Sequence, residues 1–269
     1  MSETVSQAVL YAVDHAVATI TLNRPDSKNR LDAAGMAALA ECFARAAADD
    51  SVRVVVLTGS GNTFCSGADM SAAVTGDAAG FTGSGPAALV GVLTAMLDLP
   101  KPIIAKVQGH VAGGGNGLVA AADIAMASAD ARFAFSEVRI GVAPAVISVV
   151  CLQVMNRRAA QDLFLTGERV DADRVLEAGL LTSVIAADGL DAAVAGRVEQ
   201  LLAGGPSALA GAKDLLRRIP ALPLDEAFEE AASMSASLFA SAEAQEGMNA
   251  FLEKRAPNWA GLSAGKRES

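Results

Sequence analysis

Aromatic residues are scarce in this chain of 269 residues, at 4% of the sequence, with one Trp and one Tyr. The apolar share is nevertheless 52% and the charged share only 19%, so the chain can bury a sizeable core and does not have the composition of a disordered protein. Much of the apolar content is alanine, which favours closely packed helices. The length predicts one large α/β domain, with or without a helical appendage.

Long apolar runs are also missing. The longest apolar stretches, residues 111–122 and 145–155, are too short to span a bilayer. The first twenty residues have neither the basic start nor the continuous apolar run of a signal peptide. We therefore expect a cytoplasmic protein that does not bind membranes.

Positive charge, histidine and cysteine are equally sparse. The net charge is −9 and no Lys/Arg cluster is large, which argues against nucleic acid as a partner and leaves room for an anionic ligand only at a local patch. Two histidines are too few for a histidine-rich metal centre. The three cysteines are odd in number and widely spaced, so we expect them to be reduced and to act as small apolar residues. They are Cys42, Cys65 and Cys151.

Apolar periodicity and turn residues predict alternating strands and helices. A hairpin over residues 9–13 and 16–22 is followed by a helix that Asp32 caps and that ends near Ala48. Further expected elements are strands over 52–58, 103–107, 123–128 and 132–135 and a helix over 86–98. The Gly- and Ser-rich stretch Val74–Pro86 is the best candidate for a mobile segment.

From Pro206 onward the periodicity is purely helical. Alternating strands and helices predict parallel βα units followed by a helical module. We therefore divide the chain into a core domain, residues 1–205, and a C-terminal helical module, residues 206–269.

Two glycine-rich loops follow strongly apolar strands, where ligands bind in open α/β sheets. Gly113–Gly115 lets a ligand approach the bare backbone, and a helix that starts there has free N–H groups. Such N–H groups can stabilise a developing oxyanion by about 3–4 kcal/mol each. Alternatively, the glycines serve only tight packing. A dinucleotide loop is disfavoured because Leu118 stands at the sixth position of G-x-G-x-x-G.

Glu137 follows the expected strand over 132–135 and lies among apolar neighbours. Partial desolvation there would raise its pKa to a value useful for proton transfer. The alternative is a surface ion pair with Arg139.

Together these segments resemble the enoyl-CoA hydratase/isomerase (crotonase) superfamily from about residue 9 to about residue 256. The matching motifs are Leu22-Asn23-Arg24-Pro25, Leu57-Thr58-Gly59, Phe64-x-Ser66-Gly67-Ala68-Asp69, Lys101-Pro102-Ile103-Ile104-Ala105, Gly113-Gly114-Gly115, Leu165-Thr166-Gly167-Glu168 and residues 246–255. The resemblance implies a crotonase-like α/β spiral of ββα units with a C-terminal helical trimerisation region. It also implies a homotrimer or a dimer of trimers.

The resemblance assigns roles by position. The N–H groups of Ala68 and Gly114 would form an oxyanion hole for a thioester oxygen, and Glu137 would be the acid/base. The residues that would bind the coenzyme A part of the substrate are Arg24, Lys28, Ser66, Ala68, Asp69, Gly114 and, at a neighbouring subunit's site, Lys254. The family chemistry implies no metal and no redox cofactor.

One position departs from the family pattern. Hydratases of this family carry a second glutamate three residues after the oxyanion glycine, and Gly117 stands there. We expect an enoyl-CoA hydratase, a lyase that adds water to an acyl-CoA double bond or removes it. The alternatives are a double-bond isomerase that uses Glu137 alone, or a catalytically degenerate acyl-CoA-binding protein. Four polar residues near the site are not expected to be catalytic: Asp69, Asp77, His110 and Asn116.

Overall fold

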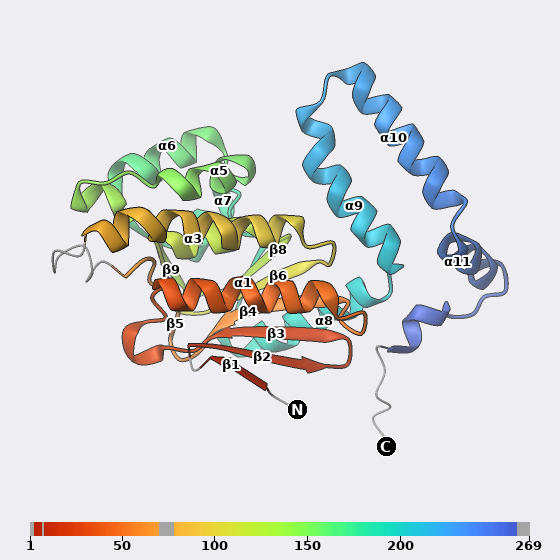
Figure 1. Ribbon diagram of the computed structural model, residues 1–269, viewed down its shortest axis with the longest axis horizontal. Coiled ribbons are helices and arrows are strands. Elements are labelled where there is room, and N and C mark those ends of the chain that lie inside the picture. The colour runs from red at the N-terminus through yellow and green to blue at the C-terminus, as the bar shows by residue number, and fades with distance from the viewer. Residues whose placement is uncertain (1–2, 7, 70–77, 263–269) are drawn as a thin grey trace.

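A computed structural model describes residues 3–6, 8–69 and 78–262 (Figure 1). Its main sheet has seven strands in the order β1-β2-β3-β4-β6-β8-β11. These strands are β1 Glu3–Ser6, β2 Val9–Asp14, β3 Val17–Leu22, β4 Val54–Gly59, β6 Ile103–Val107, β8 Ile124–Ser128 and β11 Ser183–Ile185. The strands from β3 to β11 are parallel, as the alternation of strands and helices predicted.

The expected N-terminal hairpin and its helix are confirmed. β2 and β3 pair antiparallel through a turn at Asp14–Val17. Helix α1, Ala33–Ala48, begins where Asp32 accepts a hydrogen bond from the Gly35 N–H at 2.7 Å, because a side-chain oxygen satisfies an N–H that has no partner within the helix.

A second, four-stranded sheet has the order β10-β9-β7-β5. Its strands are β5 Thr63–Cys65, β7 His110–Ala112, β9 Arg132–Ala134 and β10 Arg169–Asp171. Only β9 was expected, since three-residue strands leave little periodicity in a sequence. β5 and β7 run parallel, and their carboxyl ends lead into the loops that carry Gly67 and Gly113.

One predicted loop is wrong. Helix α3 spans Ala78–Asp98, so it starts eight residues before the expected Pro86, and residues 78–86 are helical. Residues 74–77 of the expected mobile segment lie outside the described residues. A proline removes one intrahelical hydrogen bond and therefore resembles a helix start in a sequence. Here Leu89, Leu93 and Met96 are buried farther along α3, and their packing stabilises the helix.

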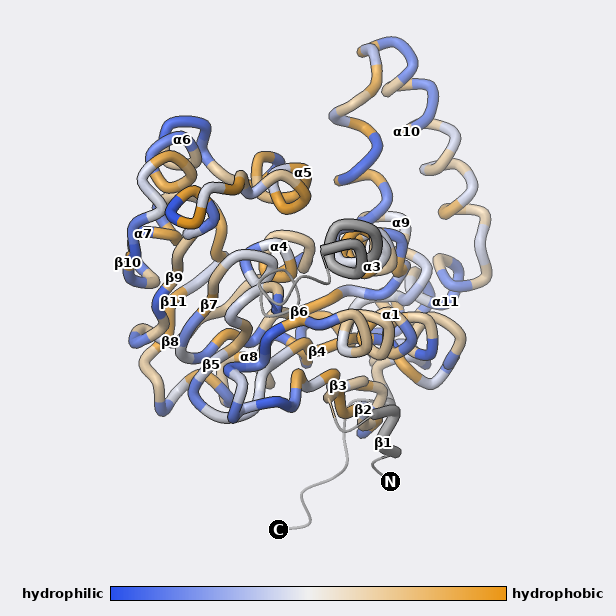
Figure 2. Tube along the Cα trace, turned by 60° about the vertical axis from the view of Figure 1, so that its left-hand side comes forward, coloured by the Kyte–Doolittle hydropathy of each residue, from blue (hydrophilic) through white to orange (hydrophobic). Residues whose placement is uncertain are grey.

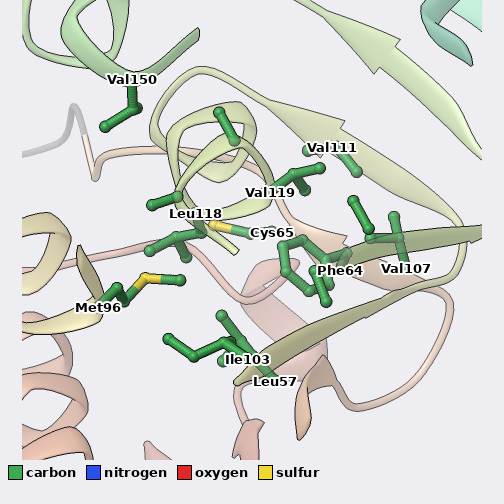
Figure 3. Close-up of a cluster of buried hydrophobic side chains, with 14 of the residues drawn as sticks. Leu57, Phe64, Cys65, Met96, Ile103, Val107, Val111, Leu118, Val119 and Val150 are labelled. Carbon is green, nitrogen blue, oxygen red and sulfur yellow. The ribbon is translucent and has the colours of Figure 1, made fainter. Parts of the chain in front are cut away.

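The remaining helices of the core cover the two sheets and connect their strands. They are α4 Gly114–Ala121, α5 Ala145–Val154, α6 Arg157–Thr166, α7 Ala172–Glu177 and α8 Leu190–Leu202, with short 3-10 turns η1 Pro25–Ser27, η2 Ser136–Ile140 and η3 Ala187–Gly189. Buried side chains from β4, β5, β6, β7, α3, α4 and α5 gather in one cluster, which includes Phe64, Met96 and Leu118 (Figure 3). The three cysteines are free and buried, as expected.

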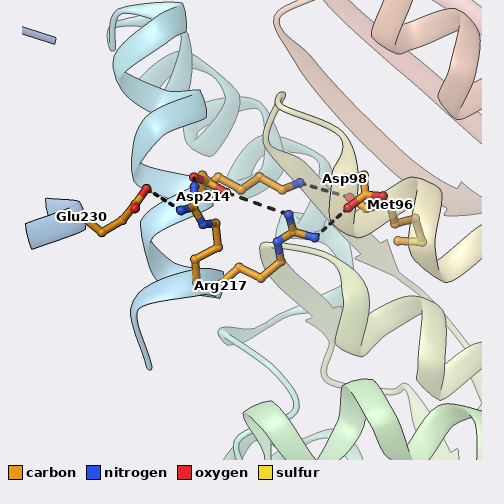
Figure 4. Close-up of polar contacts among 7 residues, drawn as sticks. Met96, Asp98, Asp214, Arg217 and Glu230 are labelled. Atoms are coloured by element: carbon orange, nitrogen blue, oxygen red, sulfur yellow. Dashed lines mark hydrogen bonds and ion pairs between the residues drawn. The ribbon is translucent and has the colours of Figure 1, made fainter. Parts of the chain in front are cut away.

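The C-terminal part is helical, as predicted, with α9 Pro206–Arg218, η4 Ile219–Ala221, α10 Leu224–Phe239, α11 Ala242–Leu252 and η5 Asn258–Leu262. In Figures 1 and 2, α9 and α10 project away from the sheet. Lys213 of α9 holds this pair to the core, because its Nζ bonds the Met96 carbonyl at 3.3 Å and the Asp123 carboxylate at 2.8 Å. Arg217 adds an ion pair with Asp98 at 2.6 Å (Figure 4).

The C-terminal helices also expose large apolar side chains. Those of Leu216, Leu224, Phe228, Phe239, Phe251 and Leu252 are all exposed. Within the described ranges, no helix combines the length and hydropathy that crossing a membrane requires.

Candidate active site

Three segments that are distant in sequence converge beside Gly113. A Cβ added to Gly67 would lie 3.3 Å from the Gly113 Cα, and one added to Gly113 would lie 3.6 Å from the Gly67 Cα. The same added Cβ at Gly113 would lie 3.6 Å from Oε1 of Glu137. Both glycines have positive φ, +89° and +50°, a conformation that L side chains rarely adopt. The loops after β5 and β7 therefore meet at bare backbone next to one carboxylate.

The Ala68 N–H is oriented by its neighbours. Leu31 donates its N–H to the Gly67 carbonyl at 2.8 Å and accepts the Asp69 N–H at 2.9 Å. In a parallel bridge of this kind, the N–H of the residue between the two partners points to the opposite side. Ala68 as a residue is exposed.

The Gly114 N–H opens α4, whose N-cap is Gly113. The first N–H groups of a helix lack intrahelical acceptors and carry the positive end of its dipole. Among the described residues, neither the Gly114 N–H nor the Ala68 N–H donates a backbone hydrogen bond. Within the described ranges, neither N–H would lose a backbone partner by receiving an anionic oxygen.

Glu137 lies on η2, directly after β9. Its Oε2 atom is buried and has no hydrogen-bond partner within the described part of the chain. Burial raises the pKa of Glu137 above its ordinary value of 4.5, because the charged form loses hydration. The surface pair with Arg139 is not formed, since the Arg139 Nε instead donates to the Gly167 carbonyl at 2.8 Å. Glu137 thus has the environment of a proton-transfer group.

Gly117 lies one turn farther along α4 and is tightly packed. A Cβ added there would lie 2.6 Å from Cγ2 of Ile147 and 3.7 Å from Cδ1 of Leu93. Ile147 is buried, with 2% of its surface exposed. A Cβ added to Gly114 would contact Leu89 and Leu31 at 3.4 and 3.5 Å. This face of α4 is therefore apolar, and a side chain at position 117 would displace Ile147. No local sequence signal pointed to Ile147.

The residues expected to bind coenzyme A lie in different settings. The Arg24 guanidinium bonds the Asp32 carboxylate, so it is already paired at the N-terminus of α1. Lys28 is exposed, and its carbonyl accepts the Ser66 N–H at 3.1 Å. Asp69 forms an ion pair with Arg30 at 3.1 Å. The structure therefore brings Lys28, Ser66 and the loop of Ala68 together.

Lys254 stands apart from that group. It follows α11, which lies on the other side of the molecule from β5 in Figures 1 and 2. This separation is compatible with the expectation that Lys254 serves a neighbouring subunit, which stays a prediction.

Other polar residues near the site have structural contacts. His110 of β7 lies 2.8 Å from the Arg169 guanidinium through Nδ1, and Asn116 donates its Nδ2–H to the Ala134 carbonyl at 2.8 Å. Asp77 lies outside the described residues. In the described ranges, no group of three or more His, Cys, Asp and Glu side chains is arranged to hold a metal ion.

Known proteins are similar to this chain in sequence and in fold. The profile of the enoyl-CoA hydratase/isomerase family matches residues 12–262. A carnitinyl-CoA dehydratase of Salmonella typhi is 35% identical over 250 residues, which cover 90% of this chain and 94% of the relative. The crystal structure of an enoyl-CoA hydratase of Mycobacterium smegmatis is 35% identical, with a TM-score of 0.85 over 94% of this chain and 99% of the other.

A second structure, an enoyl-CoA hydratase from Shewanella pealeana, has a TM-score of 0.88 at 31% identity, over 94% of this chain and 96% of the other. The profile match spans both glycine loops, Glu137 and the C-terminal helices. The chain therefore belongs to the enoyl-CoA hydratase/isomerase family and has the crotonase fold.

Proposed function

We propose that this enzyme binds an acyl-CoA thioester with its carbonyl oxygen between the N–H groups of Ala68 and Gly114, and that Glu137 transfers the proton. The observation that carries this proposal is the position of the Glu137 carboxylate, whose Oε1 atom would lie 3.6 Å from a Cβ on Gly113. Two N–H donors stabilise the negative charge of a thioester enolate, while a carboxylate of raised pKa exchanges protons with carbon.

The first candidate reaction is hydration of a 2-enoyl-CoA, or the reverse dehydration. The water oxygen adds to C3, its proton passes to Glu137, and the enolate at C2 is then protonated. The proposal is supported by the relatives, which are named hydratases and a dehydratase. Enolate stabilisation and proton transfer need no redox cofactor, so coenzyme A would take part only as a portion of the substrate.

Double-bond isomerisation is the second candidate, and the packing of Gly117 favours it. Hydration in this family's pattern uses two carboxylates to hold one water, and here the Cβ of a second glutamate at position 117 would lie 2.6 Å from Cγ2 of Ile147. A single carboxylate is sufficient to remove a proton from one carbon of a 3-enoyl-CoA and return it to another. The apolar face of Leu89, Leu93 and Ile147 would exclude water from that transfer.

The coenzyme A portion would extend over two adjacent loops, one with Lys28 and one with Ser66 and Ala68. Backbone contacts from Ser66 and Ala68 would hold the adenine end, and Asp69 would orient this loop through Arg30. Lys28 would supply positive charge for a phosphate. Arg24 would do so only by leaving Asp32, so we expect the smaller contribution from Arg24.

A homotrimer, or a dimer of trimers, would cover the exposed apolar residues of α9, α10 and α11. Phe228 and Phe251 expose 69% and 82% of their surface, which is unfavourable for isolated side chains of this size in water. Association of copies through these helices would bury them and bring Lys254 to a neighbouring site.

The test is a substrate series in ¹⁸O-labelled water with the wild-type protein and Glu137→Gln. Hydration of a 2-enoyl-CoA places ¹⁸O on C3, whereas isomerisation of a 3-enoyl-CoA yields a conjugated thioester without ¹⁸O. We expect Glu137→Gln to lower turnover by about 10²–10⁴-fold, the contribution of a positioned acid/base.

Each result has a separate meaning. Label on C3 supports the hydratase, and unlabelled conjugated product supports the isomerase. Acyl-CoA binding without turnover in the wild type would mean that the protein is a degenerate binder. Unchanged turnover in Glu137→Gln would remove Glu137 from the mechanism.

A further inference from the structure

Asn116 is a fully buried amide in the first turn of α4. Its backbone N–H donates to the Gly113 carbonyl at 2.9 Å, so the residue is part of the turn that presents the Gly114 N–H. Its side-chain Nδ2–H leaves the helix and donates to the Ala134 carbonyl at 2.8 Å. Asn116 thus links the start of α4 to the end of β9.

The Ala134 carbonyl connects the start of α4, which carries the Gly114 N–H, to the segment that carries Glu137. It accepts a second hydrogen bond from the Gly113 N–H at 3.3 Å. Ala134 is the last residue of β9, and Glu137 follows it by three residues on η2. The longer bond from Gly113 and the shorter bond from Asn116 therefore tie the N-terminus of α4 to the segment that carries the carboxylate.

The far side of η2 is held by a different set of contacts. Arg139 donates to the Gly167 carbonyl at 2.8 Å, and the rings of Phe135 and Phe164 are in contact at an interplanar angle of 33°, with centroids 4.6 Å apart. These contacts fix η2 against α6 and do not involve α4. The pairing of β7 with β9 places the two backbones, and Asn116 adds a side-chain hydrogen bond from α4 to the end of β9, the strand that leads into η2.

The Asn116 amide does not serve stability well. Its Oδ1 atom is buried and has no hydrogen-bond partner in the described part of the protein. A buried polar atom without a partner costs about 1–3 kcal/mol, and an apolar residue of similar size would avoid that cost. The buried Oδ1 atom therefore destabilises the fold, and only the Nδ2 atom of the amide makes a hydrogen bond.

We propose that Asn116 is a positioning residue for proton transfer, holding Glu137 at the distance from the oxyanion donors that the reaction requires. This inference rests on the proposed role of Glu137. Displacements of about 1 Å in such a site can cost 10²-fold in rate, so we expect a measurable effect from the loss of the shorter of the two hydrogen bonds to the Ala134 carbonyl. Substrate binding depends on other residues and is not affected.

The test compares Asn116→Leu with the wild-type protein and with Asn156→Leu. Leucine has the branched shape of asparagine but is larger and cannot donate a hydrogen bond. Asn156 also donates an amide N–H to a carbonyl, that of Glu177 at 2.9 Å, but it is exposed at the start of α6. We expect Asn116→Leu to lower kcat by about 10- to 100-fold with KM nearly unchanged in the folded protein, and Asn156→Leu to leave kcat unchanged.

Three outcomes would overturn the inference: a kcat of Asn116→Leu within about twofold of wild type, a rise in KM alone, or a loss of activity that only follows loss of folded protein. If the leucine variant does not fold, Asn116→Ala removes the same donor without added volume and should show the same fall in kcat. A full kcat in a folded Asn116→Ala protein would also overturn it. Failure of the proposed function is distinguishable, because it would appear as unchanged turnover in Glu137→Gln.

Discussion

Two regions of the site lie one helical turn apart on α4 and differ completely in chemistry. On the carboxylate side, a Cβ on Gly113 would meet the Glu137 Oε1 atom at an ordinary contact distance of 3.6 Å. On the apolar side, a Cβ on Gly117 would meet Ile147 at 2.6 Å, closer than real Cβ contacts allow. The first glycine leaves room beside a polar group, and the second is required by packing.

This difference shows that, in the described part of the chain, no cavity lies next to Gly117, where hydratases of the family carry a second glutamate. Ile147 is buried there together with Leu93, and protein interiors are packed too closely for a longer side chain to enter freely. A carboxylate on the apolar side would also lose its hydration without gaining a charged partner. Gly117 and Ile147 are therefore matched to each other, and in the proposed mechanism proton transfer would fall to Glu137 alone.

Among substitutions on α4, the largest expected loss of activity comes from Gly114, which lies between Gly113 and Gly117 in the sequence. Gly114→Pro removes the N–H that would bind the thioester oxygen, and proline is tolerated at the first position of a helix. Because loss of one oxyanion donor costs about 10²–10³ in rate, we expect kcat/KM to fall by that factor. Steady-state kinetics with the preferred acyl-CoA measures it.

Gly114→Ala is the matched control. It adds the same Cβ, which would contact Leu89 at 3.4 Å and Leu31 at 3.5 Å, and it keeps the N–H. We expect a much smaller effect from alanine than from proline. Equal rates in the two variants, both folded, would show that the Gly114 N–H does not bind the oxyanion.

A smaller effect, on the free energy of unfolding, is expected when Gly117→Glu places a carboxylate on the apolar side of α4. Gly117→Glu must displace Ile147, and overpacking a core typically costs about 1–3 kcal/mol. We therefore expect a lower free energy of unfolding and no gain in hydration of a 2-enoyl-CoA. Denaturant unfolding and the ¹⁸O assay measure the two quantities.

The double variant Gly117→Glu with Ile147→Ala sharpens the comparison. Removal of the Ile147 side chain beyond Cβ opens the volume that the glutamate needs, so part of the lost stability should return relative to Gly117→Glu. Hydration should increase relative to isomerisation in the double variant only. A single Gly117→Glu protein that is as stable as wild type would contradict the matched packing of positions 117 and 147.

Local signals in the sequence predicted much of the fold. Asp32 before an apolar stripe predicted the start of α1, and continuous β-branched runs predicted β4 and β6. Glycine runs after strands predicted the start of α4 within one residue of Gly113. In each case, the signal and the structure it determines lie within a few residues of each other.

Long-range contacts were beyond prediction from the sequence. Positions 117 and 147 are far apart along the chain, so the loss of a side chain at one and the apolar residue at the other gave no joint signal. The link from Asn116 to Ala134 depends in the same way on β9 lying beside α4. Pro86 misled the prediction of α3, because packing of the helix outweighs one lost hydrogen bond. The division at residue 205 stays a prediction.

The smallest expected effect is the pH dependence of activity and stability that the raised pKa of Glu137 would cause. Burial raises the pKa of Glu137 above 4.5, and the carboxylate must be ionised to accept a proton. Wild-type kcat/KM should therefore rise tenfold per pH unit, about 1.4 kcal/mol, up to a plateau that begins above the ordinary carboxyl range.

The same raised pKa predicts a pH-dependent stability. The pKa of Glu137 in the folded state is higher than in the unfolded state, so the ionised carboxylate destabilises the fold. That penalty is absent below the unfolded pKa and complete above the folded pKa. Glu137→Gln should thus have a higher melting temperature than wild type at neutral pH, and the difference should vanish as the pH falls below the unfolded pKa. A difference that stays constant with pH would mean that Glu137 is not desolvated, and the contrast between the two sides of α4 would lose its electrostatic basis.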